Sequence, residues 1–171
     1  MVGNSWVSSL GGPLIVVPQS ALPWWTGGDS AHGSAEDRDD YGRACAVDGF
    51  IGLIPVGEQH ALVLGDDPAD TMYLPQERSF LRWLAADREE DLVGTARRAL
   101  RGGVRWDADE DVTWVVDGPV VLFDAAWSGS DLELEVAGHR VIDLEPGTYR
   151  VRAAQHTDDR NMMILVSLLR A

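Results

Sequence analysis

Apolar positions along the chain change their spacing twice, and these changes separate strand-like from helix-like stretches. In the N-terminal part, short aliphatic runs lie between turn residues, as expected of buried strands. We predict strands at 14–17, 50–55 and 60–64, the last two joined as a hairpin around residues 56–59. Residues 26–40 carry mainly Gly, Ser, Asp and Glu, so we predict an exposed, mobile loop there.

The spacing becomes helical in the middle of the chain. Apolar side chains recur at intervals of three and four residues at Phe80, Leu81, Trp83, Leu84, Leu92, Val93, Ala96, Ala99 and Leu100. Pro75 suits the first turn of a helix, and the glycines at 102–103 would end it. We predict that residues 76–101 are mostly helical. Asp87 and Glu90 have the spacing of a capping box, which leaves open whether there is one helix or two.

After residue 103 the chain returns to two-residue spacing. Leu132, Leu134 and Val136 alternate with two glutamates, the pattern of a strand with one wet face. Further strands are predicted at 112–116, 120–123, 132–136, 139–144, 149–154 and 162–169. With these strands, the sequence predicts an α+β fold, mainly antiparallel β-sheet and sandwich-like, with one helical insertion around residues 76–101. We expect a single domain over residues 1–171.

The composition adds a strong negative charge to this picture. There are 28 Asp and Glu against 14 basic residues, all of them arginine, and the net charge is −14. Such a chain repels nucleic acid and anionic membranes, and it is attracted to basic surfaces. An apolar content of 45% and seven tryptophans exclude a disordered acidic tail.

Several features favour a cytoplasmic location. The aliphatic runs are far too short to span a bilayer, and no basic residue precedes Arg38, so the basic n-region of a secretory signal is missing. The single cysteine, Cys45, cannot form an internal disulfide, which agrees with a reducing compartment. Its neighbours are small and apolar, so we expect Cys45 to be buried.

Each candidate chemical site lacks a residue that its chemistry requires. Asp107, Asp109 and Asp111 have the alternate spacing of a calcium loop, but Val112 and Gly118 stand where that loop needs Gly and Glu. The four histidines (His32, His60, His139 and His156) have no metal-ligand spacing. The chain contains no G-x-S-x-G, and its glycine pairs lack the Lys of a phosphate loop. We therefore expect no catalytic residue, no cofactor, no metal and no enzyme activity.

The tryptophans admit two interpretations. Trp83 lies on the apolar stripe of the predicted helix and Trp114 is central in a strand, so we interpret both as core residues. Trp24, Trp25 and Trp127 adjoin loops, where an aromatic side chain either joins the core, the commoner case, or anchors a partner. The acidic stretches 29–40 and 107–111 likewise admit two interpretations: a solvated surface, the commoner case, or a surface that contacts a partner.

The order of several segments resembles one known family. The segments are Trp6-Val7-x-Ser9-x-Gly11-Gly12-Pro13-Leu14-Ile15, Trp25-x-Gly27, Asp40-Tyr41-x-Arg43-Ala44-Cys45, Ala61–Pro68, Phe80-Leu81-Arg82-Trp83, Leu122-Phe123-Asp124-Ala125-Ala126 and Gly147-x-Tyr149-x-Val151. Together they are similar to the immunity proteins of bacterial polymorphic toxin systems, specifically the family numbered twenty-one. The likeness runs over nearly the whole chain, and its most specific parts are the Gly-Gly-Pro-Leu-Ile opening and the Asp-Tyr-x-Arg-Ala-Cys block.

The resemblance implies a small cytoplasmic protein, encoded beside a toxin, that binds and neutralises it. A useful target would act in the same compartment, as a nuclease, a deaminase or a nucleotide-consuming enzyme does. A nuclease must present a basic groove to phosphate, and an acidic inhibitor can occupy that groove. The residues we expect to bind the toxin are Asp37, Asp39, Asp40, Asp107, Asp109 and Asp111, with Trp24, Trp25 and Trp127 as anchors.

Two other classes of protein stay open. One is an enzyme whose site is assembled from scattered residues, for which acids near Arg43 or Arg82 are candidates; a deep cleft with converging carboxylates and histidine would favour it. The other is a ligand-binding β-sandwich, favoured if Trp24, Trp25 and Trp127 line one open groove. The sequence sets neither the oligomeric state nor the identity of a toxin.

Overall fold

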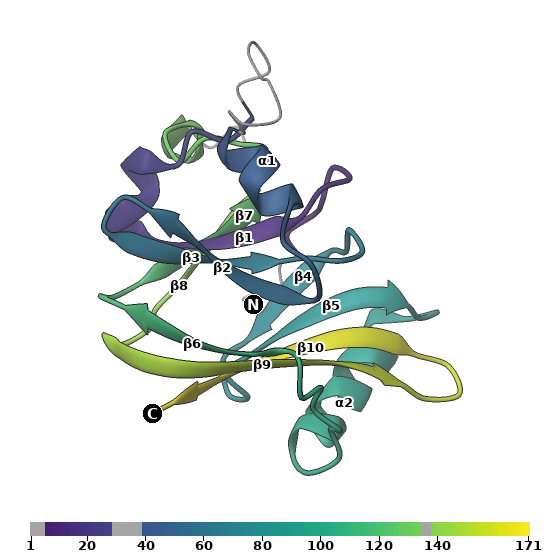
Figure 1. Ribbon diagram of the computed structural model, residues 1–171. Helices are drawn as coiled ribbons and strands as arrows, with labels where there is room; N and C mark the ends of the chain where they lie inside the picture. Colours follow the sequence, from purple (N-terminus) through teal and green to yellow (C-terminus); the bar gives the residue numbers. More distant parts are fainter. Residues whose placement is uncertain (1–5, 29–38, 135–137) are drawn as a thin grey trace.

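Two antiparallel sheets of five strands each pack face to face in the computed structural model, which describes residues 6–28, 39–134 and 138–171 (Figure 1). The first sheet contains, in spatial order, β2 (Ile51–Val56), β3 (Gln59–Leu64), β1 (Leu14–Pro18), β7 (Val120–Asp124) and β8 (His139–Ile142). The second contains β4 (Thr71–Leu74), β5 (Ser79–Ala85), β10 (Met162–Arg170), β9 (Gly147–Thr157) and β6 (Asp111–Val116). The predicted sandwich-like α+β fold is confirmed.

Helical segments cover the outer faces of both sheets. The first sheet is covered by two short 3-10 helices, η1 (Gln19–Trp24) and η2 (Asp131–Leu134), and by α1 (Asp40–Cys45). The helix α2 (Glu89–Leu100) packs beneath the second sheet (Figure 1). Strands such as β1 and β7 are therefore buried on both faces, whereas the edge strands β6 and β8 keep exposed positions.

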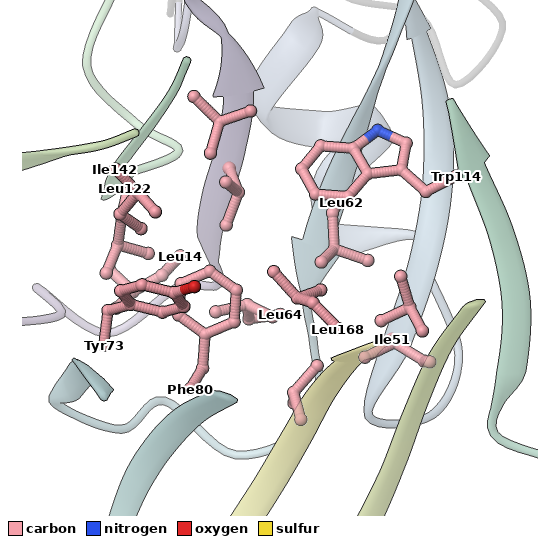
Figure 2. Close-up of a cluster of buried hydrophobic side chains, with 14 of the residues drawn as sticks. Leu14, Ile51, Leu62, Leu64, Tyr73, Phe80, Trp114, Leu122, Ile142 and Leu168 are labelled. Atoms are coloured by element: carbon pink, nitrogen blue, oxygen red, sulfur yellow. The ribbon is translucent and has the colours of Figure 1, made fainter. Parts of the chain in front are cut away.

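The main core lies between the two sheets. Leu62, Leu64 and Leu122 of the first sheet meet Phe80 and Trp114 of the second (Figure 2). Because the outer faces are also covered, all five residues of β1 are buried. This double burial explains why the strands read as continuous aliphatic runs rather than as an alternating pattern.

The stretch predicted to be helical divides into a strand and a helix. Residues 79–85 form β5, which pairs with β4 and β10, and only Glu89–Leu100 is helical. Phe80 enters the core between the sheets, whereas Leu81 packs with α2. Adjacent apolar positions are thus both buried, and their spacing imitates that of a helix. Pro75 lies in the turn between β4 and β5 rather than in a first helical turn.

The predicted capping box does not form. Arg88 is the N-cap residue of α2, and its side chain makes no capping hydrogen bond. The first turn instead carries Glu89, Glu90 and Asp91, whose charges interact favourably with the positive end of the helix dipole. Residues 76–101 therefore contain neither one long helix nor two helices, but the strand β5 followed by the helix α2.

The C-terminal half shows one further difference from the prediction. Residues 132–134 belong to the 3-10 helix η2 and not to a strand. The chain turns at Ser128, whose backbone oxygen accepts a hydrogen bond from the N–H of Asp131, and Leu132 then packs into the apolar cluster on the outer face of the first sheet, which we call its outer core. Residues 135–136 of that predicted strand lie outside the described residues.

The other predicted strands are present, with ends that shift by up to a few residues, and the hairpin around 56–59 is confirmed. The predicted loop at 26–40 lies mostly outside the described residues, which resume at residue 39. In the described part of the chain, no helix is long and apolar enough to cross a membrane.

Candidate functional site

A hollow of about 320 Å³ lies at one end of the first sheet, where segments far apart in the sequence meet. It is the end at which α1 leads into β2, on the right in Figure 1. The hollow is lined by the loop 11–13, by Tyr41, Ala44 and Cys45 of α1, by the loop 47–49, and by Gly65, Asp66 and Pro68 of the loop that follows β3. Asp48 and Asp66 are the only charged residues among those described in the lining. We call this region the acidic hollow.

The wall formed by residues 11–13 is positioned by a buried carboxylate. Asp124 is 3% exposed and accepts hydrogen bonds from the backbone N–H groups of Leu10 at 2.8 Å and Ala126 at 2.9 Å. Gly12 allows a close approach here, since a Cβ at this position would lie 2.2 Å from the Tyr41 hydroxyl. The glycine thus lets the phenol ring of Tyr41 pack directly against the backbone of the loop.

Two predicted partner-binding aspartates, Asp39 and Asp40, fix the start of α1. Asp39 is the N-cap residue, and its carboxylate accepts a hydrogen bond from the backbone N–H of Gly42 at 2.6 Å. Asp40 accepts one from the backbone N–H of Thr26 at 2.7 Å and forms an ion pair with Arg43 at 2.6 Å. Burial alone would raise the pKa of Asp40, but these contacts outweigh it and hold the pKa below its usual value.

The C-terminal end of α1 places a thiol in the hollow. Ala44 faces the sheet and is 1% exposed, so the next side chain along this short helix, Cys45, points toward solvent. The expectation that Cys45 is buried was therefore wrong. A hydrogen bond to Cys45, together with burial and nearby negative charges, raises the pKa of Tyr41, so the phenol stays neutral.

A buried arginine holds the loop 65–68 from below. Arg82 of β5 is fully buried and donates hydrogen bonds to the backbone oxygens of Gly65 at 2.6 Å and Asp67 at 2.8 Å. Burial lowers its pKa to about 10, and the charges of Asp66 and Asp67 oppose that shift, so Arg82 remains a cation. Asp66 has a φ of 66°, a conformation that aspartate tolerates better than most residues.

Glu110 brings the second acidic stretch to the same end of the molecule. Its carboxylate accepts hydrogen bonds from the backbone N–H groups of Phe50 at 2.8 Å and Ile51 at 3.1 Å. Gly49, with a φ of 86°, leaves the space for this contact, since a Cβ there would lie 2.1 Å from Oε1 of Glu110. The loop that carries Asp107 and Asp109 is thereby held against the loop that carries Asp48.

The predicted aspartates differ in how free they are. Asp107 and Asp109 are exposed, and the Asp107 carboxylate accepts a hydrogen bond from the backbone N–H of Asp109 at 3.0 Å. Asp111 instead forms a two-pronged ion pair with Arg150, which holds the pKa of Asp111 below its usual range. Asp37 lies outside the described residues.

The three tryptophans suggested as anchors are in different environments. Trp25 is 1% exposed and donates its indole N–H to the backbone oxygen of Ala125, so it is a core residue and we remove it from the proposed surface. Trp24 is 61% exposed, and Trp127 is half-buried against the outer core of the first sheet. Because Trp25 is enclosed, the three do not line one open groove.

The two tryptophans predicted to be core residues also differ. Trp114 is fully buried, as predicted, and its indole N–H donates to the backbone oxygen of His60 at 2.8 Å. Trp83 is only half-buried, because it lies on β5 and packs at the margin of α2 against Trp6, with 5.2 Å between ring centroids.

Four residues of this end were missed in the sequence. Asp48 and Asp66 read as turn residues beside glycine, and Glu110 read as part of a solvated acidic run. Leu10, which is 74% exposed and directly precedes the lining residue Gly11, belongs to no pattern in the sequence that would have singled it out. Among the described residues, no group of three or more His, Cys, Asp and Glu is arranged to hold a metal ion.

The geometry is that of an antiparallel sandwich with an acidic end, a kind of fold that supports many functions. Comparison with family models narrows the choice of function, because the model of immunity protein 21 matches residues 5–161. The chain therefore belongs to the immunity protein 21 family, which makes it an immunity protein with a toxin as its general partner. Searches of curated proteins and of solved structures gave no match.

Proposed function

We propose that this immunity protein neutralises a nuclease toxin in the cytoplasm by placing its acidic end in the basic groove of the toxin. The observation that carries the proposal is the acidic hollow, whose charged lining residues, Asp48 and Asp66, are both negative. Asp107 and Asp109 extend the negative surface. Leu10, which precedes the lining residue Gly11 in the chain, offers an exposed apolar side chain.

The charge pattern suits this partner for a physical reason. A nuclease needs a cationic groove to bind phosphate, and an acidic protein competes for the same charges. Attraction between opposite charges speeds association to about 10⁸–10⁹ M⁻¹s⁻¹, from roughly 10⁵–10⁶ for an unassisted encounter. The net charge of −14 also opposes binding to nucleic acid or to an anionic membrane, so we propose neither as a partner.

The same residues support an inhibitor rather than an enzyme. The carboxylates around the hollow have structural duties, since Asp39, Asp124 and Glu110 each accept backbone N–H groups. The acid beside Arg43, Asp40, has a lowered pKa, whereas a general acid or base works best with a pKa near neutrality. The proposal requires no cofactor or metal.

Co-expression with the protein encoded by the adjacent gene tests the function. We expect the neighbour alone to arrest growth and degrade cellular nucleic acid, and we expect this immunity protein to restore growth and to co-purify with it. A neighbour that is harmless when expressed alone would contradict the inhibitor proposal. A toxic neighbour that is rescued while nucleic acid stays intact would contradict only the assignment as a nuclease.

A further inference from the structure

A second cleft, of about 400 Å³, opens at the end of the sandwich opposite the acidic hollow. In Figure 1 it belongs to the end marked by the C-terminus. One side is formed by the second sheet, through Tyr73 and Arg78 around the turn between β4 and β5. The other side is formed by β8 and the residues that follow it, 140–145, while Tyr149 and Arg170 complete the lining. We call it the arginine–tyrosine cleft.

Tyr73 offers a hydrogen-bond donor to this cleft. Its ring packs in the core against Phe80, with 5.1 Å between ring centroids, and the residue is 7% exposed (Figure 2). Within the described part of the chain, its hydroxyl has no hydrogen-bond partner and is not among the enclosed polar atoms, so it meets the solvent of the cleft. Burial raises the pKa of Tyr73, and the hydroxyl therefore keeps its proton.

Arg78 supplies a positive charge beside that hydroxyl. Its charge acts on Tyr73, where it partly offsets the effect of burial on the pKa. The guanidinium is exposed and forms no ion pair with any described residue. The backbone is fixed, because the N–H of Leu168 donates to the oxygen of Arg78 at 2.9 Å. Arg78 also has a φ of 48°, a conformation that glycine or asparagine adopts more easily, so arginine is not the residue that the turn itself favours.

Among the described residues, the contacts of the other polar groups in the lining do not involve the Arg78 guanidinium. Arg170 forms an ion pair with Glu145 and donates to the backbone oxygen of Pro146 at 2.9 Å. Tyr149 donates its hydroxyl to the backbone oxygen of Glu145 at 2.7 Å. In a protein with a net charge of −14, the described lining of this cleft contains three arginines (Arg78, Arg140 and Arg170) and two acids, Asp143 and Glu145.

We propose that the arginine–tyrosine cleft binds an oxyanion, a carboxylate or a phosphate group, with the Arg78 guanidinium and the Tyr73 hydroxyl as its ligands. A guanidinium and a phenol hydroxyl are both donors, and a charge-assisted hydrogen bond from arginine is about twice as strong as a neutral one. The oxyanion comes either from a free small molecule or from an acidic side chain of the toxin. The second source rests on the function proposed above.

The test is a titration with inorganic phosphate and with glutarate, each compared with sodium chloride at equal ionic strength. Binding is followed in two-dimensional ¹H–¹⁵N spectra of the wild-type protein and of Arg78→Gln, Tyr73→Phe and Arg105→Gln. Arg105→Gln is the matched control, since Arg105 is exposed, lies outside the cleft and loses the same charge. Tyr73→Phe removes only the hydroxyl and keeps the ring packed against Phe80.

We expect shifts confined to residues 73–78, 140–145, 149 and 170, with the same affinity in Arg105→Gln. Arg78→Gln should weaken binding at least about tenfold, and Tyr73→Phe should weaken it roughly fivefold. The proposal is overturned if neither anion shifts these resonances beyond chloride, or if Arg78→Gln and Arg105→Gln bind equally well.

A second arm identifies the source of the oxyanion by measuring the affinity of the toxin for Arg78→Gln and Arg105→Gln. If only Arg78→Gln loses affinity for the toxin, the cleft binds an acidic side chain of the toxin. If the toxin binds both variants equally well, the ligand of the cleft is a free anion. If the neighbouring gene product is not a toxin, the function proposed above fails. The titration with phosphate and glutarate still decides whether the cleft binds an oxyanion.

Discussion

The two ends of the sandwich use arginine in opposite ways. At the acidic end, Arg82 is buried and directs its guanidinium to the backbone oxygens of Gly65 and Asp67, so its charge lies inside the protein and the surface stays negative. At the other end, Arg78 and Arg170 reach the surface of a cleft. The net charge of −14 describes neither end, because the sign of each surface depends on which arginines are enclosed.

The strand β3 connects the two ends, and side chains of the second sheet donate hydrogen bonds to the backbone near both of its ends. The indole of Trp114 donates to the backbone oxygen of His60 near its start, and Arg82 donates to that of Gly65 just after its end. The donor at one end is the neutral indole of Trp114, and the donor at the other end is the charged guanidinium of Arg82. The difference predicts that the two ends respond differently to substitution.

The largest loss of stability is expected from Trp114→Ala. Trp114 is fully buried, so its removal should lower the free energy of unfolding by about 3–5 kcal/mol. Trp83→Ala should cost less than about half as much, because Trp83 is half-buried at the margin of the second sheet. Urea denaturation of both variants measures the difference, and equal losses would show that the two tryptophans are placed wrongly.

Arg82→Met should lower the free energy of unfolding by roughly 2–4 kcal/mol, because it leaves two carbonyl oxygens without their charged donor. Arg105→Met, on an exposed loop, should stay within about 0.5 kcal/mol of the wild type. A loss below about 1 kcal/mol for Arg82→Met would mean that the loop 65–68 does not depend on the buried cation.

At the opposite end, Arg78→Gly should raise the free energy of unfolding by about 0.5 kcal/mol, because glycine adopts a φ of 48° with less strain than arginine. The same substitution should abolish binding of phosphate. Thermal unfolding and the titration described above measure the two effects. A loss of stability in Arg78→Gly would indicate that Arg78 serves the fold rather than a ligand.

The smallest effect is expected at Asp158, which lies in the turn between β9 and β10. Hydrogen bonds from the backbone N–H of Arg160 and from Asn161 lower the pKa of Asp158 to about 2, from an ordinary 3.8. A carboxyl group with a lowered pKa stabilises the fold above its ordinary pKa, and that contribution is lost as the pH falls from about 4 to about 2. Asp158→Asn should therefore be less stable at neutral pH and should change less over that interval. Denaturation curves that run parallel for the two proteins would contradict this.

The sequence predicted the strands well where burial and turns coincide, as in β1 between Gly12 and Pro18 and in the hairpin of β2 and β3. It failed at Phe80 and Leu81, because burial on both faces of a sheet removes the alternation that distinguishes a strand from a helix.

The candidate site was predictable only in part. Three of the segments that carry the family resemblance, at 6–15, 40–45 and 61–68, contribute to the lining of the acidic hollow, but its charges could not be assigned from sequence. Asp111 is engaged by Arg150 across two strands, and Glu110 is engaged by Phe50 and Ile51, contacts that depend on the tertiary fold. Asp48 and Asp66 lie together for the same reason.

The central claim, that the acidic end receives the toxin, is tested most directly by association rates. The double variant Asp48→Asn/Asp66→Asn is compared with Glu58→Gln/Glu90→Gln, which removes the same charge from exposed positions away from the hollow. Rates are measured by stopped flow at ionic strengths of about 0.01 M and 0.15 M, where charges are screened beyond roughly 30 and 8 Å.

We predict that the wild type and the control associate rapidly at low salt and slow steeply at high salt. The Asp48→Asn/Asp66→Asn variant should associate about tenfold more slowly at low salt, with a weaker dependence on salt. Equal rates for the two double variants, or a rate for the wild type that ignores salt, would contradict the claim.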